Sequence, residues 1–307
     1  MMSKVFIYSE NMSLAGELIS LGEESGMTVS AICLKEEEAL SLSKYGAREI
    51  FVLNGDSSRP EDYAKPIADL LSEQNAQLFL VGATISGREL AAQVAALLKI
   101  GLTSDPLSID FSDDENVRTV RTMHGGATTL AEVSSGLHVI TVPFGKAIAE
   151  TVEDAAPEMH SRSVTCNSKV RLIETQDIER EGVDISKAKR LVCVGMGFSK
   201  KEDLSIAIDL AEAIEGEIAC TRPIASDREW MPMDTYIGLS GKVVKPDLFI
   251  ALGDSGQIQH TYGIRDSKII VGINNNEKAT IFQVSDYGIV GDLYEVAPLL
   301  TQALKEA

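Results

Sequence analysis

The chain has 307 residues, of which 44% are hydrophobic and 24% charged, and its 46 acidic against 28 basic residues give a formal net charge of −18. This length supports one large or two ordinary domains with full cores, and the negative charge argues against nucleic acid or an anionic membrane surface as a partner. The N-terminal residues lack a secretory-signal pattern and no apolar run is long enough to cross a bilayer, so we expect a cytoplasmic protein without membrane insertion.

The first half of the chain alternates short β-branched runs with helical patterns. Strands are expected at 4–9, 29–34, 49–53 and 78–83, and helices at 13–25, 35–46 and 63–74. This order predicts parallel strands that are joined by helical crossovers.

A further helix is expected after Ser86, where Ser86 and Glu89 form a capping-box pattern. The apolar residues that fall on one face of this helix are Leu90, Val94, Leu97 and Leu98. We therefore expect the helix to face the core.

The region 101–150 changes to strand-like pieces such as 117–123 and 138–143, which Gly125-Gly126 separates. We expect these pieces to extend the first sheet. From about 151 to 188 the chain is polar and weakly patterned, and we interpret the later part of it as a linker. The predicted domains are therefore 1–187 and 188–307.

Alternation resumes in the second half. Strands are expected at 190–197, 217–223, 247–253 and 268–274, and a closing helix at about 292–305. Another helix is expected from Ser199, where Ser199 and Glu202 form a second capping-box pattern. Its predicted buried face consists of Leu204, Ala207, Ile208, Ala211 and Ile214.

The predicted fold class is α/β, with two doubly wound α/β domains. The N-terminal domain is expected to carry a Rossmann-like sheet of the nucleotide-hydrolase type, and the C-terminal domain a parallel sheet that binds a ligand.

The four cysteines are far apart, and three of them lie in apolar runs where cysteine behaves as a small buried hydrophobe. They are Cys33, Cys166, Cys193 and Cys220. We expect neither a disulfide framework nor a metal site.

Small and polar residues are concentrated just after the strands of the second half, where an open parallel sheet binds its ligands. The segments are 195–199, 220–223, 238–242, 253–260, 273–276 and 284–288. Glycine allows close approach of the backbone, and Arg222, Lys242 and His260 supply positive charge in an acidic chain. Together these segments suit a phosphate-bearing aromatic cofactor.

Taken singly, these segments leave alternatives open. Gly195 and Gly197 form only the opening of a dinucleotide fingerprint, and a plain strand-to-helix turn is the alternative. The loop 253–260 could hold a phosphate or form a capped turn. His260 alone could equally be a satisfied core residue or a surface residue.

Two other functions are therefore weighed. An NAD(P)-dependent dehydrogenase would need an acidic residue about 20 positions after the glycines, and the chain has Cys220-Thr221-Arg222 there. A non-redox nucleotide-binding or sensing protein would fit the N-terminal half.

The stretch from Cys220 to Val296 carries an ordered set of short motifs. These are Thr221-Arg222, Ser240-Gly241-Lys242, Ser255-Gly256, Gln259-His260, Asn274 and Ser285-Asp286-Tyr287-Gly288. In this order they resemble the FAD-binding C-terminal domain of electron transfer flavoprotein alpha subunits, a FixB-like family. The first half matches the N-terminal α/β domain of that family in length and layout.

The resemblance implies FAD as the cofactor. It places Arg222 against the isoalloxazine, Ser240 near flavin N5, and Gln259 and His260 beside the flavin and its ribityl chain. It places Ser255 and Gly256 near the pyrophosphate with Thr221 close by, and Asn274 and Asp286 at the adenosine end. The implied cofactor-binding residues are Thr221, Arg222, Ser240, Gly241, Ser255, Gly256, Gln259, His260, Asn274 and Asp286.

The resemblance also implies an electron carrier without substrate turnover, catalytic residue or metal of its own. A beta subunit carrying AMP or a second FAD would be its partner. Electrons would pass from a dehydrogenase of the acyl-CoA type to a quinone-linked or dehydrogenase acceptor, or within a bifurcating complex. Three residues depart from the family pattern or add charge to it, namely Met196, Leu239 and Asp254.

Overall fold

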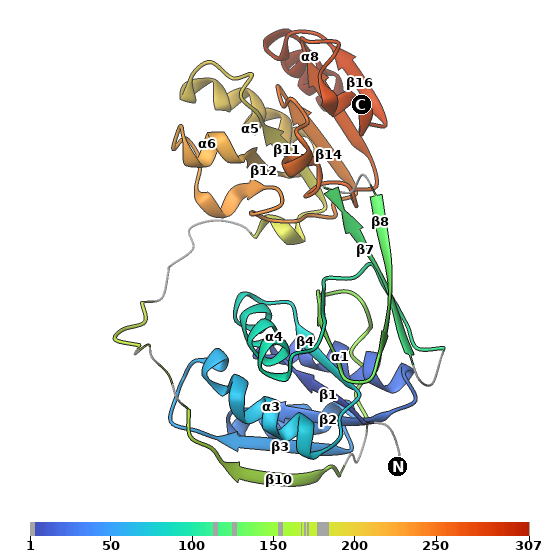
Figure 1. The fold of residues 1–307 in the computed structure, drawn as a ribbon. Coiled ribbons are helices and arrows are strands. Elements are labelled where there is room, and N and C mark those ends of the chain that lie inside the picture. Colours follow the sequence, from blue (N-terminus) through green and yellow to red (C-terminus); the bar gives the residue numbers. More distant parts are fainter. Residues whose placement is uncertain are drawn as a thin grey trace. The chain divides into compact units, whose positions relative to one another are not determined.

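The computed structural model describes residues 4–112, 116–124, 128–152, 156–166, 168, 170, 172–176 and 184–306. It divides into two compact units, Met1–Asp177 and Ile178–Ala307 (Figure 1). Each unit is an α/β layer structure, as predicted. The expected turn at Gly125-Gly126 and residues 177–183 of the expected linker lie outside the described residues.

The first unit is built on a seven-stranded sheet in the order β10-β3-β2-β1-β4-β9-β5, in which every neighbouring pair is parallel. Its strands are β1 (Lys4–Tyr8), β2 (Thr28–Cys33), β3 (Glu49–Asn54), β4 (Leu78–Gly82), β5 (Leu102–Ser104), β9 (His138–Val142) and β10 (Glu158–Ser163). Its helices are α1 (Met12–Glu24), α2 (Glu36–Leu42), α3 (Ala64–Glu73) and α4 (Ile85–Leu98), with 3₁₀ turns η1 (Ser43–Tyr45) and η2 (Pro60–Tyr63).

The sheet is covered on both faces, which explains why its strands are apolar throughout. In β1, Val5 and Ile7 pack with residues of α1 and α2 in one core. Phe6 and Tyr8 point to the other face and pack with residues of α3 and α4. The doubly wound layout of this domain is thereby confirmed.

The expectation for 101–150 is confirmed only in part. β5 and β9 extend the parallel sheet. The run 117–123 does not, because it belongs to a separate antiparallel sheet, β6-β7-β8, formed by β6 (Ser108–Asp110), β7 (Asn116–Met123) and β8 (Thr128–Ser135). Within this sheet Arg121 pairs with Glu132 at 2.9 Å, which shows that its polar residues bond across strands.

The polar region after residue 151 contains a strand that the sequence analysis missed. β10 pairs in parallel with β3 at the edge of the sheet. Its sequence EMHSRS is mostly exposed and carries no apolar alternation, so periodicity could not reveal it.

Both predicted capping boxes are wrong. The N-cap of α4 is Thr84, whose hydroxyl accepts a hydrogen bond from the Gly87 N–H at 2.9 Å. In the second unit the chain forms a 3₁₀ turn, η5 (Lys201–Asp203), and α5 begins only at Leu204 without a side-chain cap.

The burial of single helix residues also differs from the prediction in two places. Leu97 of α4 is 49% exposed, and Ile208 of α5 is 43% exposed, although both were predicted on a core face. Leu210 is buried in α5 instead.

The second unit carries a wholly parallel six-stranded sheet in the order β13-β12-β11-β14-β15-β16. Its strands are β11 (Arg190–Val194), β12 (Glu217–Thr221), β13 (Tyr236–Ile237), β14 (Leu248–Leu252), β15 (Ile270–Asn274) and β16 (Tyr287–Val290). Its helices are α5 (Leu204–Ala213), α6 (Arg222–Ser226), α7 (Ile258–Thr261) and α8 (Leu293–Lys305), with further 3₁₀ turns η4 (Ile185–Lys187), η6 (Met233–Thr235) and η7 (Thr280–Gln283). The strand order reverses between β11 and β14, so this is the switch point of the fold.

The domain boundary near 188 remains a prediction. Ile185, in η4, is buried in the core of the second unit together with Leu191 and Phe249. This packing favours a boundary before Asp184.

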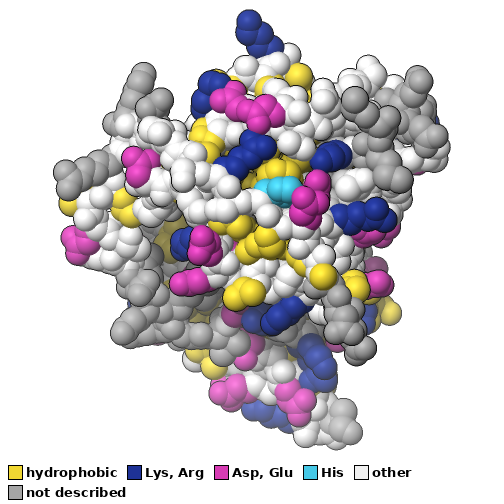
Figure 2. All heavy atoms as spheres, turned by 90° about the horizontal axis from the view of Figure 1, so that it is seen from below, with side chains coloured by type: hydrophobic (Ala, Val, Ile, Leu, Met, Phe, Trp, Pro, Cys, Tyr) yellow, Lys and Arg dark blue, Asp and Glu magenta, His cyan; other side chains and the backbone are white. Residues whose placement is uncertain are grey.

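The face of the molecule drawn in Figure 2 carries charges of both signs in spite of the net negative charge. Figure 2 shows basic, acidic and hydrophobic side chains interspersed over one face of the molecule. Among the described helices, none is both long enough and apolar enough to span a bilayer.

Candidate functional site

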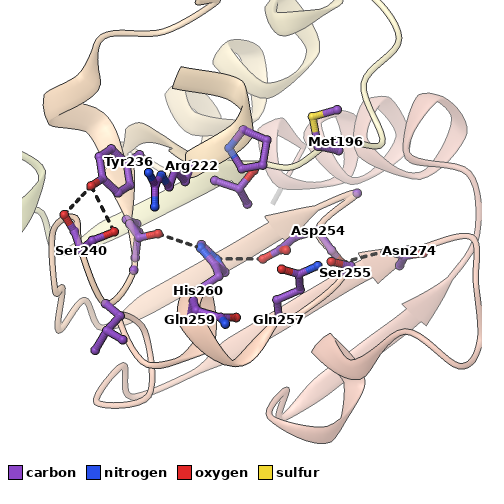
Figure 3. A pocket seen from close by; sticks show the side chains of 16 residues that line it. Met196, Arg222, Tyr236, Ser240, Asp254, Ser255, Gln257, Gln259, His260 and Asn274 are labelled. Atoms are coloured by element: carbon purple, nitrogen blue, oxygen red, sulfur yellow. Dashed lines mark hydrogen bonds and ion pairs between the residues drawn. The ribbon is translucent and has the colours of Figure 1, made fainter. Parts of the chain in front are cut away.

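A cavity of about 660 Å³ opens at the carboxyl ends of β11, β12, β14 and β15, at the switch point of the second sheet (Figure 3). Its volume is within the range of small-molecule and cofactor pockets. Seven of the ten predicted site residues line it: Thr221, Arg222, Ser240, Ser255, Gln259, His260 and Asn274. The loops that follow separate strands therefore meet as expected.

Three glycines let the loops after β11 and β14 cross in contact. A Cβ on Gly195 would lie 2.4 Å from the carbonyl oxygen of Gly253, and one on Gly197 would lie 2.7 Å from the Gly253 Cα. Gly197 donates its N–H to that same carbonyl at 2.9 Å. Gly195 and Gly197 thus allow the two loops to pack against each other, and Met196 between these glycines lines the cavity.

Arg222 provides positive charge at the cavity. It is the first residue of α6, directly after β12, and its side chain is exposed. Among the described residues, its guanidinium has no ion pair or hydrogen-bond partner. The group is therefore available to an anionic part of a ligand.

His260 and Asp254 form a buried ion pair in the cavity wall. His260 Nε2 lies 2.8 Å from Asp254 Oδ2, and both side chains are buried. Apart from this contact, Asp254 Oδ2 has no hydrogen-bond partner among the described residues, so His260 is its counter-ion when the ring is protonated. The other ring nitrogen, Nδ1, lies 3.0 Å from the carbonyl oxygen of Ile237.

The environment raises the pKa of His260 above its ordinary value. Burial is the largest single influence and lowers the pKa, but the Asp254 carboxylate and the Ile237 carbonyl together outweigh it. With acceptors facing both ring nitrogens, the protonated imidazole satisfies both contacts.

One buried thiol lies close to this pair, and a second is buried in the neighbouring strand β12. Cys193 Sγ is 3.9 Å from His260 Nε2, and burial raises the pKa of the Cys193 thiol well above its ordinary value. Burial also raises the pKa of Cys220 to about 11. Both thiols are neutral at physiological pH, and all four cysteines of the chain are free.

Thr221 presents an unpartnered hydroxyl. Its Oγ1 is buried, lines the cavity wall, and has no hydrogen-bond partner among the described residues. A buried hydroxyl without a partner costs free energy, so this atom fits a polar ligand group.

Two predicted glycines shape loops and do not line the cavity. Gly256 has a φ of +79°, and a Cβ there would lie 2.0 Å from the Ile281 backbone nitrogen. A Cβ on Gly241 would lie 2.3 Å from the Tyr236 ring. Only glycine fits at either position, whatever is bound.

The loop after β14 is held by its neighbours. Asn274 Nδ2 donates to the carbonyl oxygen of Asp254 at 2.8 Å, and Thr280 Oγ1 donates to the Ser255 and Gly256 carbonyl oxygens at 2.7 and 2.8 Å. The Gly256 N–H donates to Asp254 Oδ1 at 3.0 Å. The carboxylate of Asp254 therefore occupies an N–H of the loop that was expected to approach a phosphate.

Asp286 lies at the opposite end of the sheet. Its carboxylate accepts the N–H of Ile270 at 2.8 Å, at the start of β15, whereas Asn274 ends that strand. The two ends of a five-residue strand are about 13 Å apart at about 3.3 Å per residue. This position does not favour the expectation that Asn274 and Asp286 hold the adenosine end together, because Asp286 comes directly before β16 and does not follow a strand.

The acidic residue at the carboxyl end of β16 is Asp292, the N-cap of α8, which accepts the Tyr294 N–H at 2.9 Å. The sequence analysis also missed Tyr236 and Gln257, which line the cavity. The Tyr236 hydroxyl donates to the carbonyl oxygen of Ser240 and holds the 238–242 loop against β13. Its position one residue after η6 gave no periodic signal.

One cluster in the first unit has the composition of a metal site, and consists of Glu49, Glu158 and His160. Glu49 already accepts hydrogen bonds from Lys4 Nζ at 2.9 and 3.1 Å and from Ser30 Oγ at 2.6 Å. Its charge is balanced without a metal ion.

The chain matches two family models, "Electron transfer flavoprotein domain" over residues 12–169 and "Electron transfer flavoprotein FAD-binding domain" over residues 184–265. The candidate electron transfer flavoprotein subunit YdiR of Escherichia coli (strain K12) is 34% identical over 316 residues, covering 99% of this chain and 98% of YdiR. Protein FixB of Escherichia coli O157:H7 and that of Shigella flexneri are each 34% identical over 310 residues, covering 98% of both chains.

A solved 4-hydroxybenzoylformate decarboxylase of Rhodococcus jostii RHA1 aligns with 99% of this chain and 59% of its own at 10% identity and a TM-score of 0.25. That similarity does not establish a shared fold. The relatives cover nearly the whole chain, and the second family model, which matches the start of the C-terminal unit, is that of the FAD-binding domain. The chain belongs to the electron transfer flavoprotein family as an alpha subunit that binds FAD and pairs with a beta subunit.

Proposed function

We propose that the cavity at the switch point holds the FAD, that Arg222, Ser240, Gln259 and His260 face its flavin portion, and that Thr221 lies near its pyrophosphate. The observation that carries the proposal is that seven of the ten residues implied by the resemblance, which come from separate loops, line one cavity of about 660 Å³. Ser255 and Asn274 belong to the same wall. Asp286 is not part of this proposal.

The unpartnered groups of the cavity fit this cofactor. FAD supplies reversible acceptance of electrons, and reduction adds negative charge to its ring. Arg222 offers a cation that has no protein partner among the described residues, and the Thr221 hydroxyl offers a buried hydrogen bond. Both groups are complementary to a ligand that carries polar oxygens and gains negative charge.

An NAD(P)-dependent dehydrogenase is less well supported by the geometry. Such an enzyme places an acidic residue at the end of the strand after its glycine turn, where it binds the ribose hydroxyls. That strand is β12, which ends at Thr221 and is followed by Arg222.

The redox partners follow from the resemblance and are part of the proposal. We propose a beta subunit that carries AMP or a second FAD, a dehydrogenase donor of the acyl-CoA type, and a quinone-linked or dehydrogenase acceptor. We also propose a cytoplasmic location.

Co-expression with a beta subunit tests the cofactor assignment. The purified complex should be yellow, and on denaturation should release one FAD for each alpha subunit if the beta subunit carries AMP, or two if the beta subunit carries a second FAD. A colourless complex that binds NAD or ATP tightly would contradict the proposal. Reduction of the complex by a purified acyl-CoA dehydrogenase tests the donor.

A further inference from the structure

We propose that Asp254 is the positioning residue for His260: it holds the imidazole as a cation and balances that charge inside the cavity wall. As a result, Arg222 is the group that contributes net positive charge to the cavity. The part of this inference that concerns flavin rests on the proposed function above.

The first argument is geometric. Asp254 is anchored on three sides, because its Oδ1 accepts the Gly256 N–H, its carbonyl oxygen accepts the Asn274 amide, and its Oδ2 lies 2.8 Å from His260 Nε2. Its carboxylate cannot turn away from the ring without breaking the Gly256 contact. The ring is likewise held at Nδ1 by the Ile237 carbonyl.

The second argument is chemical. A neutral imidazole has one N–H donor and one acceptor nitrogen, whereas His260 faces a carbonyl oxygen on one side and a carboxylate on the other. A neutral ring would direct a lone pair at one of these oxygens. An unpaired buried carboxylate would be costlier still, so the charged pair is the consistent state.

The remaining groups that face His260 do not change this charge. From β11, the Cys193 thiol lies 3.9 Å from Nε2 and is neutral. From β14, the ring of Phe249 lies 6.2 Å from the imidazole, and the adjacent β13 contributes the Ile237 carbonyl. Arg222, at the start of α6, and the phenol of Tyr236 are the other titratable or charged groups that line the cavity.

Summing these groups gives the charge that a ligand meets. His260 and Asp254 cancel, and Arg222 contributes one positive charge. Because Arg222 and His260 are both basic, the sequence analysis expected both of them to supply positive charge to the ligand. The geometry of the pair gives the two residues different roles. Arg222 contributes net positive charge to the cavity, whereas His260 is held in a fixed position with its charge balanced by Asp254.

The first test needs no cofactor. Ring signals of the four histidines are followed by NMR as a function of pH in the full-length chain without FAD, and His260→Gln identifies the signal of His260. In Asp254→Asn the ring is still buried but no longer faces a carboxylate, so the pKa of His260 should fall. Its acid dissociation constant should therefore rise by about tenfold or more. Asp247→Asn, at the amino end of β14, is the control and should leave the signal unchanged.

The second test uses the FAD-loaded complex. The shift in midpoint potential that His260→Gln causes is measured in the natural background and in the Asp254→Asn background. We expect a small shift in the natural background, and a shift for Arg222→Ala that is several times larger. Coupling between the His260 and Asp254 substitutions should also be clearly different from zero.

These outcomes separate the inference from the proposed function. A His260 that titrates identically with and without the Asp254 carboxylate overturns the inference, even if FAD binds normally. A protein that binds no FAD, but whose His260 titration depends on Asp254, contradicts the proposed function and supports the inference for the charge pair. If Asp254→Asn does not fold, Asp254→Glu and the double variant Asp254→Asn/His260→Gln replace it, and recovery of folding in the double variant supports the pairing. If Asp254→Glu and the double variant also fail to fold, the titration of His260 is followed in partly folded Asp254→Asn. An unaltered titration there would overturn the inference.

Discussion

The side-chain amide of Asn274 donates a hydrogen bond to the backbone carbonyl oxygen of Asp254 at 2.8 Å. This bond joins the end of β15 to the loop that follows β14, next to the switch point of the sheet. The same side chain accepts the Asn276 N–H at 2.9 Å. Asn274 therefore holds the cavity wall in shape, in addition to any contact with the cofactor.

Asn274→Ala should destabilise the second unit by about 1–2 kcal/mol, because two hydrogen bonds are lost and the Asp254 carbonyl is left without this donor. Urea denaturation followed by the fluorescence of Trp230, the one tryptophan of the chain, measures the effect. Asn276→Ala is a matched control, since its side chain caps only the exposed Lys278 N–H and should cost well under half as much.

Thr221→Val should weaken FAD binding by roughly fivefold to tenfold, because the cofactor loses about one hydrogen bond. The chain without cofactor should be as stable as before or slightly more stable, because the substitution removes a buried hydroxyl that has no partner among the described residues. Equilibrium dialysis against FAD and thermal unfolding give the two values.

Thr301→Val serves as its control, since the Thr301 hydroxyl donates to the Ala297 carbonyl within α8. An equal loss of FAD affinity in both variants would show that the Thr221 hydroxyl has no contact with the cofactor.

Arg222→Ala should make the midpoint potential of the bound flavin more negative and raise the FAD dissociation constant by roughly tenfold, because one charge-assisted contact is lost. Arg222→Lys should restore part of the potential, since it keeps the charge. Arg228→Ala, which removes an exposed arginine that stacks on Trp230, is the control. An unchanged potential in Arg222→Ala counts against its assigned role.

Gly256→Ala should destabilise the second unit by at least about 2 kcal/mol, because the residue has a φ of +79° and the added methyl would lie 2.0 Å from the Ile281 nitrogen. Gly291→Ala tests the same change where a Cβ would meet only the end of the Val296 side chain, and it should cost less than about 1 kcal/mol. Equal costs would mean that the loop relaxes freely.

The stability of the second unit should depend on pH through His260. Its folded pKa is raised above the ordinary 6.5, so its contribution is fully present below pH 6.5 and is lost as the pH rises through the folded pKa. Unfolding followed by Trp230 should show this loss in the natural chain. In His260→Gln the same pH range should give a flat profile.

His138 in the first unit should act in the opposite sense. Burial lowers its pKa below 6.5, so its contribution is present above pH 6.5 and is lost as the pH falls through the folded pKa. His138→Gln should change the pH profile of the first unit, measured by far-ultraviolet circular dichroism, without altering the Trp230 transition.

Much of the fold could be predicted because parallel strands that are buried on both faces have continuous apolar runs in their sequence. β1, β2, β3 and β4 were placed within a residue or two for this reason. β10 could not be found, since an edge strand with exposed side chains needs only backbone pairing. The predicted start of α4 was wrong because both Thr84 and Ser86 are residue types that favour an N-cap, and in the structure Thr84 is the N-cap.

The rule that loops after parallel strands meet selected the segments of the site, and the family resemblance selected residues within them, such as Thr221 and Asn274, which line the cavity. The rule does not favour Asp286, because the strand that would place it begins one residue later. The burial of Asp254 against His260 could not be read from the chain, because an acidic residue beside a loop is ordinarily solvated. Asp254 and His260 are six positions apart, so whether they pair depends on the conformation of the loop between them.

β10 also determines how the N-terminal unit can be isolated. Val164 donates its N–H to the Asn54 carbonyl at 2.9 Å, which completes the pairing of β3 beyond the last residue of β10. A fragment that stops at residue 150 would leave the outer edge of β3 bare, with a row of backbone donors and acceptors ready to capture a strand from a second molecule. An expression fragment that ends after Val164 keeps its edge closed and should remain monomeric where the shorter one aggregates.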